Sequence, residues 1–424
     1  MSSARLVAAK VISDVQRSKS YSNIAADAAI SAAGLSRADS ALASMIIYGV
    51  LQRKITLDRI LSDYSGPNFR KTHPFVLSVL RTAAYQLLFM DRIPASAAVN
   101  ESVKIVKNSK QKFASGFVNA VLRKINTAKF NILDEIENSG DLCFKYSCTA
   151  EFADSLIADY GKQYAESFLK ASLYAPKLYC RVNSFAAQNN LFDTLASKGI
   201  TCEPCEISGA FSFSGVGAVE TCEEFQNGGF FVQDIASQKA ISALDIGNGM
   251  SVLDVCAAPG GKSFTAAQYA GKDGKIVSCD LYEKRVGLIA SGAERLKFQN
   301  ISAIVNDAAV FNANLGRFDR VICDVPCSGW GVIRRKPEIK YKQVSEFTEL
   351  PAIQLKILET SVGYLKPNGL LMYSTCTLRS AENRQVVDAF LERNNGFRIV
   401  GEKTLAPHTD GSDGFYYCIL KKEE

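Results

Sequence analysis

Two cysteines follow apolar segments whose length and composition are typical of buried strands. One segment continues into Asp324-Val-Pro-Cys327 and the other into Tyr373-Ser-Thr-Cys376. In an open α/β sheet, residues just past the carboxyl ends of strands face the crevice in which ligands bind. Helix N-termini and a lysine near that crevice would lower the pKa of a thiol and increase the fraction that can attack a substrate. Each cysteine alone is more typical of an inert buried residue, but Asp324 and a neighbouring loop favour chemistry.

That loop is the glycine-rich segment Asp254-Val-Cys-Ala-Ala-Pro-Gly-Gly-Lys262, which follows another apolar strand and opens a helix. Free backbone N–H groups and small side chains there let a ligand approach closely. The segment is neither a G-x-G-x-x-G nor a Walker loop, so it indicates a nucleoside cofactor in general, with a plain tight turn as the alternative. The next strand ends in Asp280, placed for ribose hydroxyls, and the following one in Asn306-Asp307, suited to an adenine edge. Three polar strand ends in succession favour a cofactor site over separate helix caps.

Two thiols and a carboxyl group suit methylation of carbon 5 of cytosine. This carbon is a poor nucleophile, so a thiolate must first add to carbon 6 and convert the ring to an enamine. An acid must offset the charge at ring nitrogen 3, and Asp324, kept partly protonated by burial, is the candidate. After methyl transfer a base must remove the proton at carbon 5, which gives the second cysteine a role. Only two histidines, His73 and His408, are present, so histidine triads and histidine-rich metal sites are poorly supported.

The other cysteines carry little functional signal. All 12 are scattered along the chain, several inside strand-like runs, as expected of reduced thiols. Cys202 and Cys205 form a C-x-x-C pair, but no second pair stands at zinc-ribbon spacing. We therefore expect no metal site.

The elements that must position these residues begin after Gly228, where strands and helices alternate. The expected strands are SVLDVC, KIVSCDL, AIVND, DRVICDV and LLMYSTC, with helices from Lys262, through Arg285 and around 353–365. Such alternation predicts a doubly wound, mostly parallel α/β sheet over residues 225–424.

The first third of the chain has helical apolar spacing and no strand pattern. We predict five to seven helices within an all-helical domain at residues 1–137, with breakers at Ser65-Gly66-Pro67 and Ile93-Pro94. Residues 138–224 are mixed: they contain a helical stretch at 149–172, an extended segment KLYCRVNSF, and a Gly- and Ser-rich run SGAFSFSGVGA that resembles turns. A small α+β connecting domain is expected there, because 424 residues exceed a single core.

Charge is segregated along the chain. Residues 1–130 hold 19 Lys and Arg against 7 Asp and Glu, a net of +12, whereas residues 131–424 hold 30 against 36, a net of −6. A basic module of this kind is typical of a polyphosphate partner such as RNA, with a solvated basic face as the alternative. No apolar run is long enough to span a membrane, and no secretory signal is evident, so we expect a cytoplasmic protein.

Together the segments VLDVCAAPGGKS, DVPCSGWGVIRRKPEIK, YSTCTL and Ala381-Glu-Asn383 resemble the RNA cytosine-5 methyltransferase family, the NOL/NOP/Sun or Fmu family, over essentially the whole chain. Residues 37–59 are similar to the NusB fold. The resemblance implies a Rossmann-like class I methyltransferase sheet, with Cys376 as nucleophile, Cys327 assisting product release, and Lys262 near the site of methyl transfer. It also implies that S-adenosylmethionine is held by Cys256, Ala257, Ala258, Pro259, Gly260, Gly261, Lys262, Asp280, Arg285, Asp307 and Asp324.

The resulting hypothesis is methyl transfer from S-adenosylmethionine to carbon 5 of one cytosine in 16S ribosomal RNA, through a covalent cysteine adduct, with the basic helical domain holding the RNA. A monomer without an obligate protein partner is expected. Two alternatives remain at this point: a transfer RNA target, and an inactive NusB-like RNA-binding assembly factor. All motif residues are present, which argues against the inactive factor.

Overall fold

The computed structural model describes residues 3–18, 22–186, 190–215 and 219–423. These form two compact units, each described by itself below. The first consists of residues 1–174 and 333–344, and the second of residues 175–332 and 345–424.

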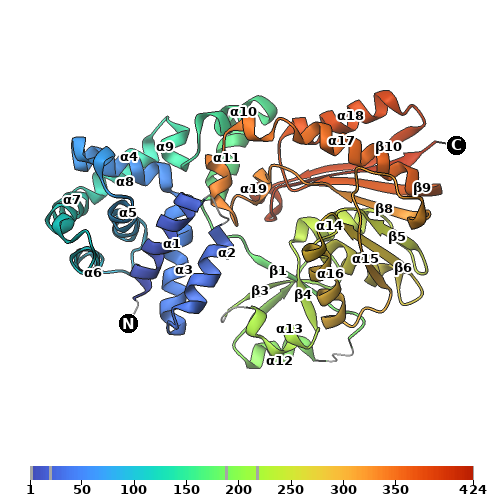
Figure 1. Ribbon diagram of the computed structural model, residues 1–424, viewed down its shortest axis with the longest axis horizontal. Helices are drawn as coiled ribbons and strands as arrows, with labels where there is room; N and C mark the ends of the chain where they lie inside the picture. Colours follow the sequence, from blue (N-terminus) through green and yellow to red (C-terminus); the bar gives the residue numbers. More distant parts are fainter. Residues whose placement is uncertain (1–2, 19–21, 187–189, 216–218, 424) are drawn as a thin grey trace. The chain divides into compact units, whose positions relative to one another are not determined.

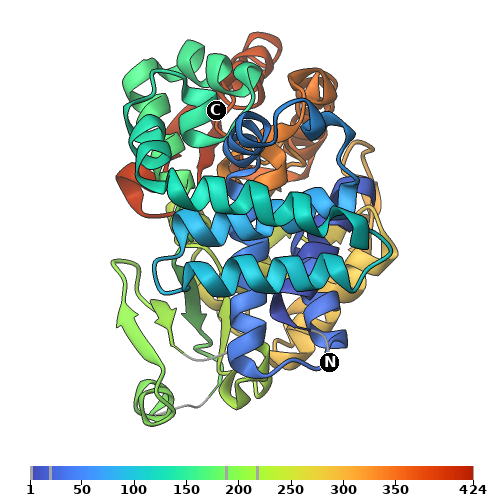
Figure 2. The same cartoon turned by 90° about the vertical axis from the view of Figure 1, so that its left-hand side faces the viewer.

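The first unit is helical, as predicted, and Figure 2 shows its helices in blue to green. Its helices are α1 (Ala4–Ser18), α2 (Ser22–Ala32), α3 (Arg37–Gln52), α4 (Lys54–Ser65), α5 (Pro74–Phe89), α6 (Ala95–Lys107), α7 (Ser115–Thr127), α8 (Lys129–Asn138), α9 (Leu142–Tyr146), α10 (Ala150–Tyr160) and α11 (Lys162–Ser172), with short 3-10 turns η1 (Gly66–Lys71) and η2 (Lys112–Ala114).

Local sequence explains where several of these helices begin and end. Pro74 occupies the first turn of α5, and the Nδ1 atom of His73 caps that turn by accepting from the N–H of Phe75. Gly66 takes a positive φ of 62° at the end of α4, and Gly161 takes 82° between α10 and α11. The helical stretch expected at 149–172 is therefore two helices.

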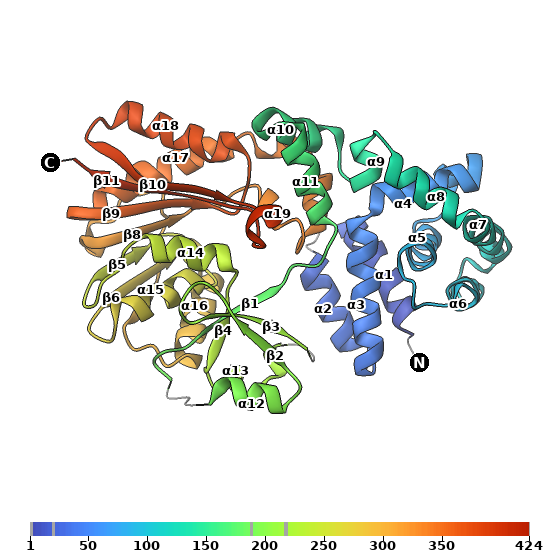
Figure 3. The same ribbon diagram turned by 180° about the vertical axis from the view of Figure 1, so that it is seen from behind.

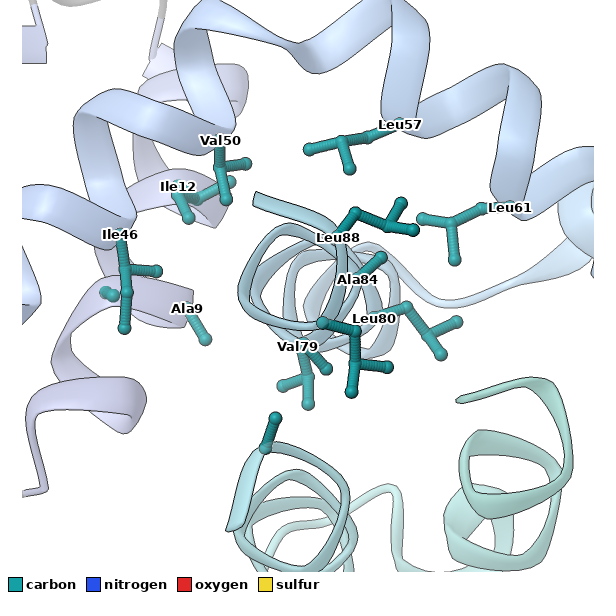
Figure 4. Packing of buried hydrophobic residues seen from close by; sticks show 14 of the residues in the cluster. Ala9, Ile12, Ile46, Val50, Leu57, Leu61, Val79, Leu80, Ala84 and Leu88 are labelled. Carbon is teal, nitrogen blue, oxygen red and sulfur yellow. The ribbon is translucent and has the colours of Figure 1, made fainter. Parts of the chain in front are cut away.

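Helix α5 lies at the centre of the core of this unit (Figure 4). Its buried side chains, among them Val79, Leu80 and Leu88, meet Ile12 from α1 and Leu57 from α4. Burial of apolar residues spaced three and four apart explains why the periodicity of the first third was readable from sequence.

The segment 333–344 belongs to the helical unit although it lies between two elements of the second unit in sequence. Its 3-10 turn η6 (Pro337–Tyr341) carries a fully buried Lys340, whose Nζ atom donates to the carbonyls of Gln52 and Tyr146 at 2.9 and 3.3 Å. The side chain of Gln52 donates in turn to the carbonyl of Ile333 at 2.9 Å. Nothing in the sequence pattern predicts that residues 333–344 pack with the helical unit.

The second unit contains a small antiparallel sheet with strand order β2-β3-β1-β4. Its elements are β1 (Leu178–Val182), α12 (Leu191–Ser197), β2 (Thr201–Pro204), β3 (Ala210–Ser214), the 3-10 turn η3 (Val219–Thr221), α13 (Glu223–Gln226) and β4 (Phe230–Val232). The extended segment around β1 is confirmed. The turn prediction for SGAFSFSGVGA is wrong at β3, because Phe211 and Phe213 are buried against Phe230; residues 216–218 of that run lie outside the described residues.

The larger sheet has seven strands in the order β10-β11-β9-β8-β5-β6-β7. Strands β5 to β9 are mutually parallel, whereas β11 is antiparallel to both β9 and β10. The predicted mostly parallel sheet is confirmed, but β10 and β11 were not expected. The elements are α14 (Ile235–Ala243), β5 (Ser251–Asp254), α15 (Gly261–Ala270), β6 (Lys275–Asp280), α16 (Glu283–Arg295), β7 (Ile301–Val305), β8 (Phe318–Asp324), α17 (Leu350–Ser361), β9 (Leu365–Thr375), α18 (Arg384–Arg393), β10 (Phe397–Leu405), α19 (Pro407–Asp410) and β11 (Phe415–Lys422), with 3-10 turns η4 (Ala313–Leu315), η5 (Trp330–Val332), η7 (Val344–Phe347), η8 (Val362–Tyr364) and η9 (Ser380–Glu382).

Helices cover both faces of this sheet (Figures 1 and 3). Helices α14, α15 and α16 pack on one face with Val252 and Ile322, and α17 and α18 pack on the other with Leu253 and Val321. Consecutive strand residues thus enter opposite cores, which is why the strands read as continuous apolar runs.

The compact units do not divide the chain after residues 137 and 224, where the sequence placed domain boundaries. Helices α9 to α11 pack with the helical unit, and the small sheet packs with the large one. The three-part division therefore stays a prediction about functional modules. Among the described helices, none combines the length and apolar character needed to cross a membrane.

Candidate active site

The carboxyl ends of β5, β6, β8 and β9 lie at one edge of the parallel sheet and carry the predicted site residues. Asp254, Asp280 and Asp324 are the last residues of β5, β6 and β8, and Cys376 follows directly after β9. Asp324 pairs with Ser374 in the register of β8 with β9. The loops after these strands therefore start from neighbouring positions.

The two thiols predicted to act together are in contact. The Sγ atoms of Cys327 and Cys376 lie 3.2 Å apart, and both side chains are half-buried. The hydrogen bond with the Cys376 sulfur, together with burial, raises the pKa of Cys327 well above its usual value. Cys327 therefore keeps its proton and can donate its S–H to the sulfur of Cys376.

Lys262 and Asp324 form a partly buried ion pair next to these thiols. The Nζ atom of Lys262 donates to Asp324 Oδ2 at 2.7 Å, and Ser374 donates to Oδ1 at 2.8 Å. Burial disfavours the charged amine, but the Asp324 carboxylate outweighs it and raises the pKa of Lys262; the sulfur of Cys376 is close enough to contribute. Asp324 thus accepts from two donors, and its role as the acid for nitrogen 3 stays a prediction.

The glycine-rich loop connects β5 to the N-terminus of α15, as expected. Gly260 takes a φ of 115°, and a Cβ there would lie 2.4 Å from the ring of Phe264, so the loop closes tightly only with glycine. Beneath it the buried Asp254 accepts from Ser263 at 2.7 Å, and burial raises its pKa to about 7. Burial likewise raises the pKa of Cys256 far above its usual value, which makes an inert thiol of it.

A second carboxylate, Asp280, organises the outer side of this loop. It is almost fully buried, accepts from the N–H of Ala258 at 3.3 Å, and lies 3.2 Å from Arg285, which itself donates to the carbonyl of Ala258 at 3.1 Å. Asp307 follows β7, is exposed, and caps a turn by accepting from Ala309 at 2.9 Å. Asp280 and Arg285 therefore join the loop through direct contacts, whereas the adenine role of Asp307 stays a prediction.

These residues fit S-adenosylmethionine, the cofactor that the sequence resemblance implies. Residues 256–261 carry only small side chains and lead into the N-terminus of α15, so a ligand could approach the backbone closely there. Asp280 places carboxylate oxygens beside that loop, and its contact with ribose hydroxyls stays a prediction. Lys262 connects the loop to Asp324 and to the thiols, where a transferable methyl group must be brought.

The two histidines and the C-x-x-C pair, which no sequence pattern places in the site, lie on other elements. His73 caps α5 in the helical unit, and His408 lies in α19. Cys202 is in β2 and Cys205 just after it, and burial raises the pKa of both thiols. In the described parts of the chain, no cluster of three or more His, Cys, Asp or Glu residues could hold a metal ion.

Sequence reasoning missed the glycines that bring the thiol-bearing loops together. The N–H of Gly331 donates to the carbonyl of Cys376 at 2.9 Å, and the N–H of Gly414 donates to the carbonyl of Gly331 at 2.9 Å. A Cβ on Gly331 would lie 1.8 Å from the Gly414 oxygen. Neither glycine adopts a positive φ, so no turn motif in the sequence identifies either position.

Comparison with known proteins identifies the family to which the chain belongs. Residues 241–421 match the family model described as 16S rRNA methyltransferase RsmB/F, and residues 2–127 match the NusB family. The chain is 34% identical to the probable ribosomal RNA small subunit methyltransferase B of Bacillus subtilis, covering 99% of each, and 32% identical to that of Vibrio cholerae, covering 91% of this chain and 90% of the relative.

Two solved structures share the fold. The structure of PH0851 superposes with a TM-score of 0.83 at 23% identity, over 100% of this chain and 99% of the other. NSun6 from Pyrococcus horikoshii, solved with SFG, gives a TM-score of 0.61 at 17% identity, over 65% of this chain and 98% of the other. The chain belongs to the ribosomal RNA small subunit methyltransferase B family, whose members are S-adenosylmethionine-dependent RNA methyltransferases.

Proposed function

We propose that this chain methylates carbon 5 of one cytosine in 16S ribosomal RNA and that Cys376 forms a covalent bond to the base. The observation that carries the proposal is the contact of two thiols, 3.2 Å apart, beside the Lys262–Asp324 ion pair. One thiol can attack the ring and the other can take the proton that must leave afterwards. The names of the relatives support ribosomal RNA as the substrate.

The first step is addition of the Cys376 thiolate to carbon 6 of the cytosine. The new S–C bond pushes an electron pair toward ring nitrogen 3, which must gain a proton or a strong hydrogen bond. The ammonium of Lys262 and the carboxylate of Asp324 hold a proton between them at 2.7 Å. We assign this pair as the acid that supplies nitrogen 3, in place of Asp324 alone.

Bound S-adenosylmethionine supplies an electrophilic methyl group on its sulfonium sulfur. Residues 256–262 and Asp280 would hold it, and the enamine carbon 5 would take the methyl group as the methyl–sulfur bond breaks and S-adenosylhomocysteine is left. Carbon 5 then carries both a methyl group and a proton, and the ring regains aromaticity only when that proton leaves and the bond to Cys376 breaks.

Cys327 is the base for this last step, and its position explains why it acts late. Its raised pKa comes first from the neighbouring Cys376 sulfur. Once that sulfur is bonded to carbon 6 it no longer carries negative charge, so this cause disappears and Cys327 can ionise more readily. Cys327 gives up its own proton to solvent and its thiolate accepts the carbon 5 proton. Cys376 then leaves as a thiolate, and nitrogen 3 returns its proton to the Lys262–Asp324 pair.

Variants of the two cysteines test the mechanism. Cys376→Ala should give no methylated RNA, because no adduct can form. Cys327→Ala should form the adduct and fail to release it, so a protein–RNA band should accumulate on a denaturing gel. Cys205→Ala, which removes a half-buried thiol of the small sheet, should behave as the unmodified protein. Normal turnover by the Cys376 variant would refute the mechanism.

The helical unit supports a role in holding RNA. Residues 92–133 carry eight Lys and Arg against one acidic residue, and Lys107, Lys110 and Lys112 are exposed. A pocket of 320 Å³ lined by Lys71 and Phe113, among others, lies in the same unit, and Phe113 is 80% exposed. An exposed ring among lysines can stack on an unpaired base while the lysines neutralise phosphates.

The target RNA is tested by bisulfite sequencing of total RNA from a deletion strain. We expect one 5-methylcytosine to be lost from 16S ribosomal RNA. Loss from a transfer RNA instead would show that transfer RNA is the substrate. We further propose that the chain acts as a monomer in the cytoplasm, where such RNA is assembled. Sedimentation of the purified protein checks the oligomeric state.

A further inference from the structure

The segment that carries Cys376 is held from both sides by one buried side chain. Thr375 donates its hydroxyl to Asn383 Oδ1 at 2.5 Å, and Asn383 Nδ2 donates to the carbonyl of Thr377 at 3.0 Å. These two residues flank the nucleophile in sequence. The single amide of Asn383 therefore fixes the backbone on either side of Cys376.

The segment that carries Cys327 is held in the same way by the preceding residue of the chain, Glu382, and its partner Gln354. The fully buried Glu382 accepts at Oε2 from the N–H of Ser328 at 2.8 Å and from Gln354 Nε2 at 3.0 Å. Gln354 Nε2 also donates to the carbonyl of Pro326 at 2.9 Å. Residues 326 and 328 flank Cys327, so both of its neighbours are bonded to the Glu382–Gln354 pair.

The hydrogen bonds around Cys376 and those around Cys327 are connected to each other. Ser328 Oγ and Thr377 Oγ1 lie 2.8 Å apart, which links the two loops directly. Glu382 Oε1 accepts from Arg379 at 2.9 Å, and the carbonyl of Glu382 accepts from the Tyr373 hydroxyl at 2.6 Å. A buried carboxylate with this many donors has one geometry, because the loss of any donor would leave a buried charge less satisfied.

We propose that Glu382 and Asn383 are positioning residues that set the two thiols relative to each other: Asn383 aims Cys376 for attack, and Glu382 aims Cys327 for release. Because the two residues are consecutive, the peptide bond between them fixes the hydrogen bonds around Cys376 relative to those around Cys327. Both side chains are buried and are bonded to the segments that carry the thiols. The inference rests on the proposed function, since it assigns each residue to a step of that mechanism.

Glu382→Gln tests whether Glu382 positions Cys327 for release of the product. An amide has one acceptor oxygen where the carboxylate has two, and its NH₂ would face N–H donors, so at least one contact to Ser328, Gln354 or Arg379 must be lost. Displacement of a reacting group by about 1 Å costs on the order of 100-fold. We expect adduct breakdown to slow about 10- to 100-fold, with adduct formation changed less than about threefold, so that the adduct accumulates.

Asn383→Ala tests whether Asn383 positions Cys376 for attack on the base. It removes the bonds to Thr375 and Thr377, so the Cys376 segment is no longer fixed. Adduct formation should slow about 10- to 100-fold, and no adduct should accumulate, because release then outpaces attack. Both rates are read in single-turnover reactions with excess protein, end-labelled RNA and saturating S-adenosylmethionine, with the adduct resolved on denaturing gels.

Controls separate positioning from general damage to the fold. Gln385→Ala alters an exposed neighbour in α18 and should leave both rates unchanged. Circular dichroism and titration with S-adenosylmethionine report whether each variant is folded. Should Glu382→Gln or Asn383→Ala fail to fold, Gln354→Leu tests positioning for release and Thr375→Val positioning for attack, with the same expected split.

The results distinguish this inference from the function on which it rests. Methylation by Cys376→Ala would overturn the covalent mechanism itself. If the cysteine variants behave as expected but the Glu382 and Asn383 variants slow the same step, or match Gln385→Ala, the positioning proposal fails alone. A split in which one variant accumulates adduct and the other does not supports it.

Discussion

Substituting the buried Lys340 with methionine should change how the stability of the helical unit depends on pH. Burial lowers the pKa of Lys340 from 10.5 to about 7, and no part of its side chain is exposed. As a neutral amine it has two N–H groups, which match the carbonyls of Gln52 and Tyr146. The folded protein therefore prefers to release this proton.

The sign follows from the two pKa values. Between pH 7 and 10.5 the unfolded chain holds a proton on Lys340 that the folded chain has lost, so the free energy of unfolding rises with pH. Below pH 7 Lys340 is protonated in both the folded and the unfolded protein, so the full free-energy cost of burying the charged amine lowers the stability. The difference between 10.5 and about 7 corresponds to about 5 kcal/mol at about 1.4 kcal/mol per pH unit. Between pH 7 and 9 the expected gain is about 2 kcal/mol.

Urea unfolding followed by helical circular dichroism at pH 7 and pH 9 measures this gain. The unmodified protein should become about 2 kcal/mol more stable relative to Lys340→Met on going to pH 9. Lys170→Met, at an exposed lysine of the same unit, should titrate like the unmodified protein. Equal pH dependence in Lys340→Met and the unmodified protein would show that Lys340 remains charged when buried, and the reasoning would be wrong.

Three further substitutions probe the site and the RNA-binding unit. Gly331→Ala places a Cβ 1.8 Å from the Gly414 oxygen, so it should cost about 1–3 kcal/mol of stability and at least about 100-fold in methylation, whereas Gly287→Ala, with open space around it, should cost neither. Asp280→Ala should weaken S-adenosylmethionine binding about 10- to 100-fold in calorimetry, from loss of charged hydrogen bonds, and unchanged affinity would remove Asp280 from the cofactor site. Phe113→Ala should weaken RNA binding about 5- to 100-fold in a filter assay and leave cofactor binding intact; equal RNA affinity would exclude base stacking at that ring.

The parallel part of the sheet was predictable because its strands are apolar on both faces. Strands β5, β6 and β8 each end in an aspartate, and Cys376 follows β9. Because strand ends of a parallel sheet share one edge, Asp280, Asp324 and Cys376 could be brought together from sequence alone. Strands β10 and β11 gave a weaker signal. Exposed and half-buried residues alternate along most of β10, and only the four-residue helix α19 separates it from β11.

Contacts between distant segments were not predictable. Lys340 looks in sequence like any surface lysine, and only the packing of 333–344 into the helical unit reveals its burial. The Ala381-Glu-Asn383 motif was visible, but its role depends on hydrogen bonds to residues 326, 328, 375 and 377, which lie on other elements. Local propensity carries no information about such partners.

Two thiols in contact order the reaction in a way that a thiol and a carboxylate could not. A carboxylate placed 3.2 Å from Cys376 would be charged at neutral pH from the start and would oppose formation of the attacking thiolate. Cys327 instead stays protonated while the Cys376 sulfur can carry charge, since that sulfur raises its pKa. Its protonated S–H stabilises the attacking sulfur, and alkylation of that sulfur removes the main reason for Cys327 to remain neutral. In the proposed mechanism the first step therefore frees the base for the last one. The distance between the two sulfurs, and the residues that fix it, would then determine when the product leaves.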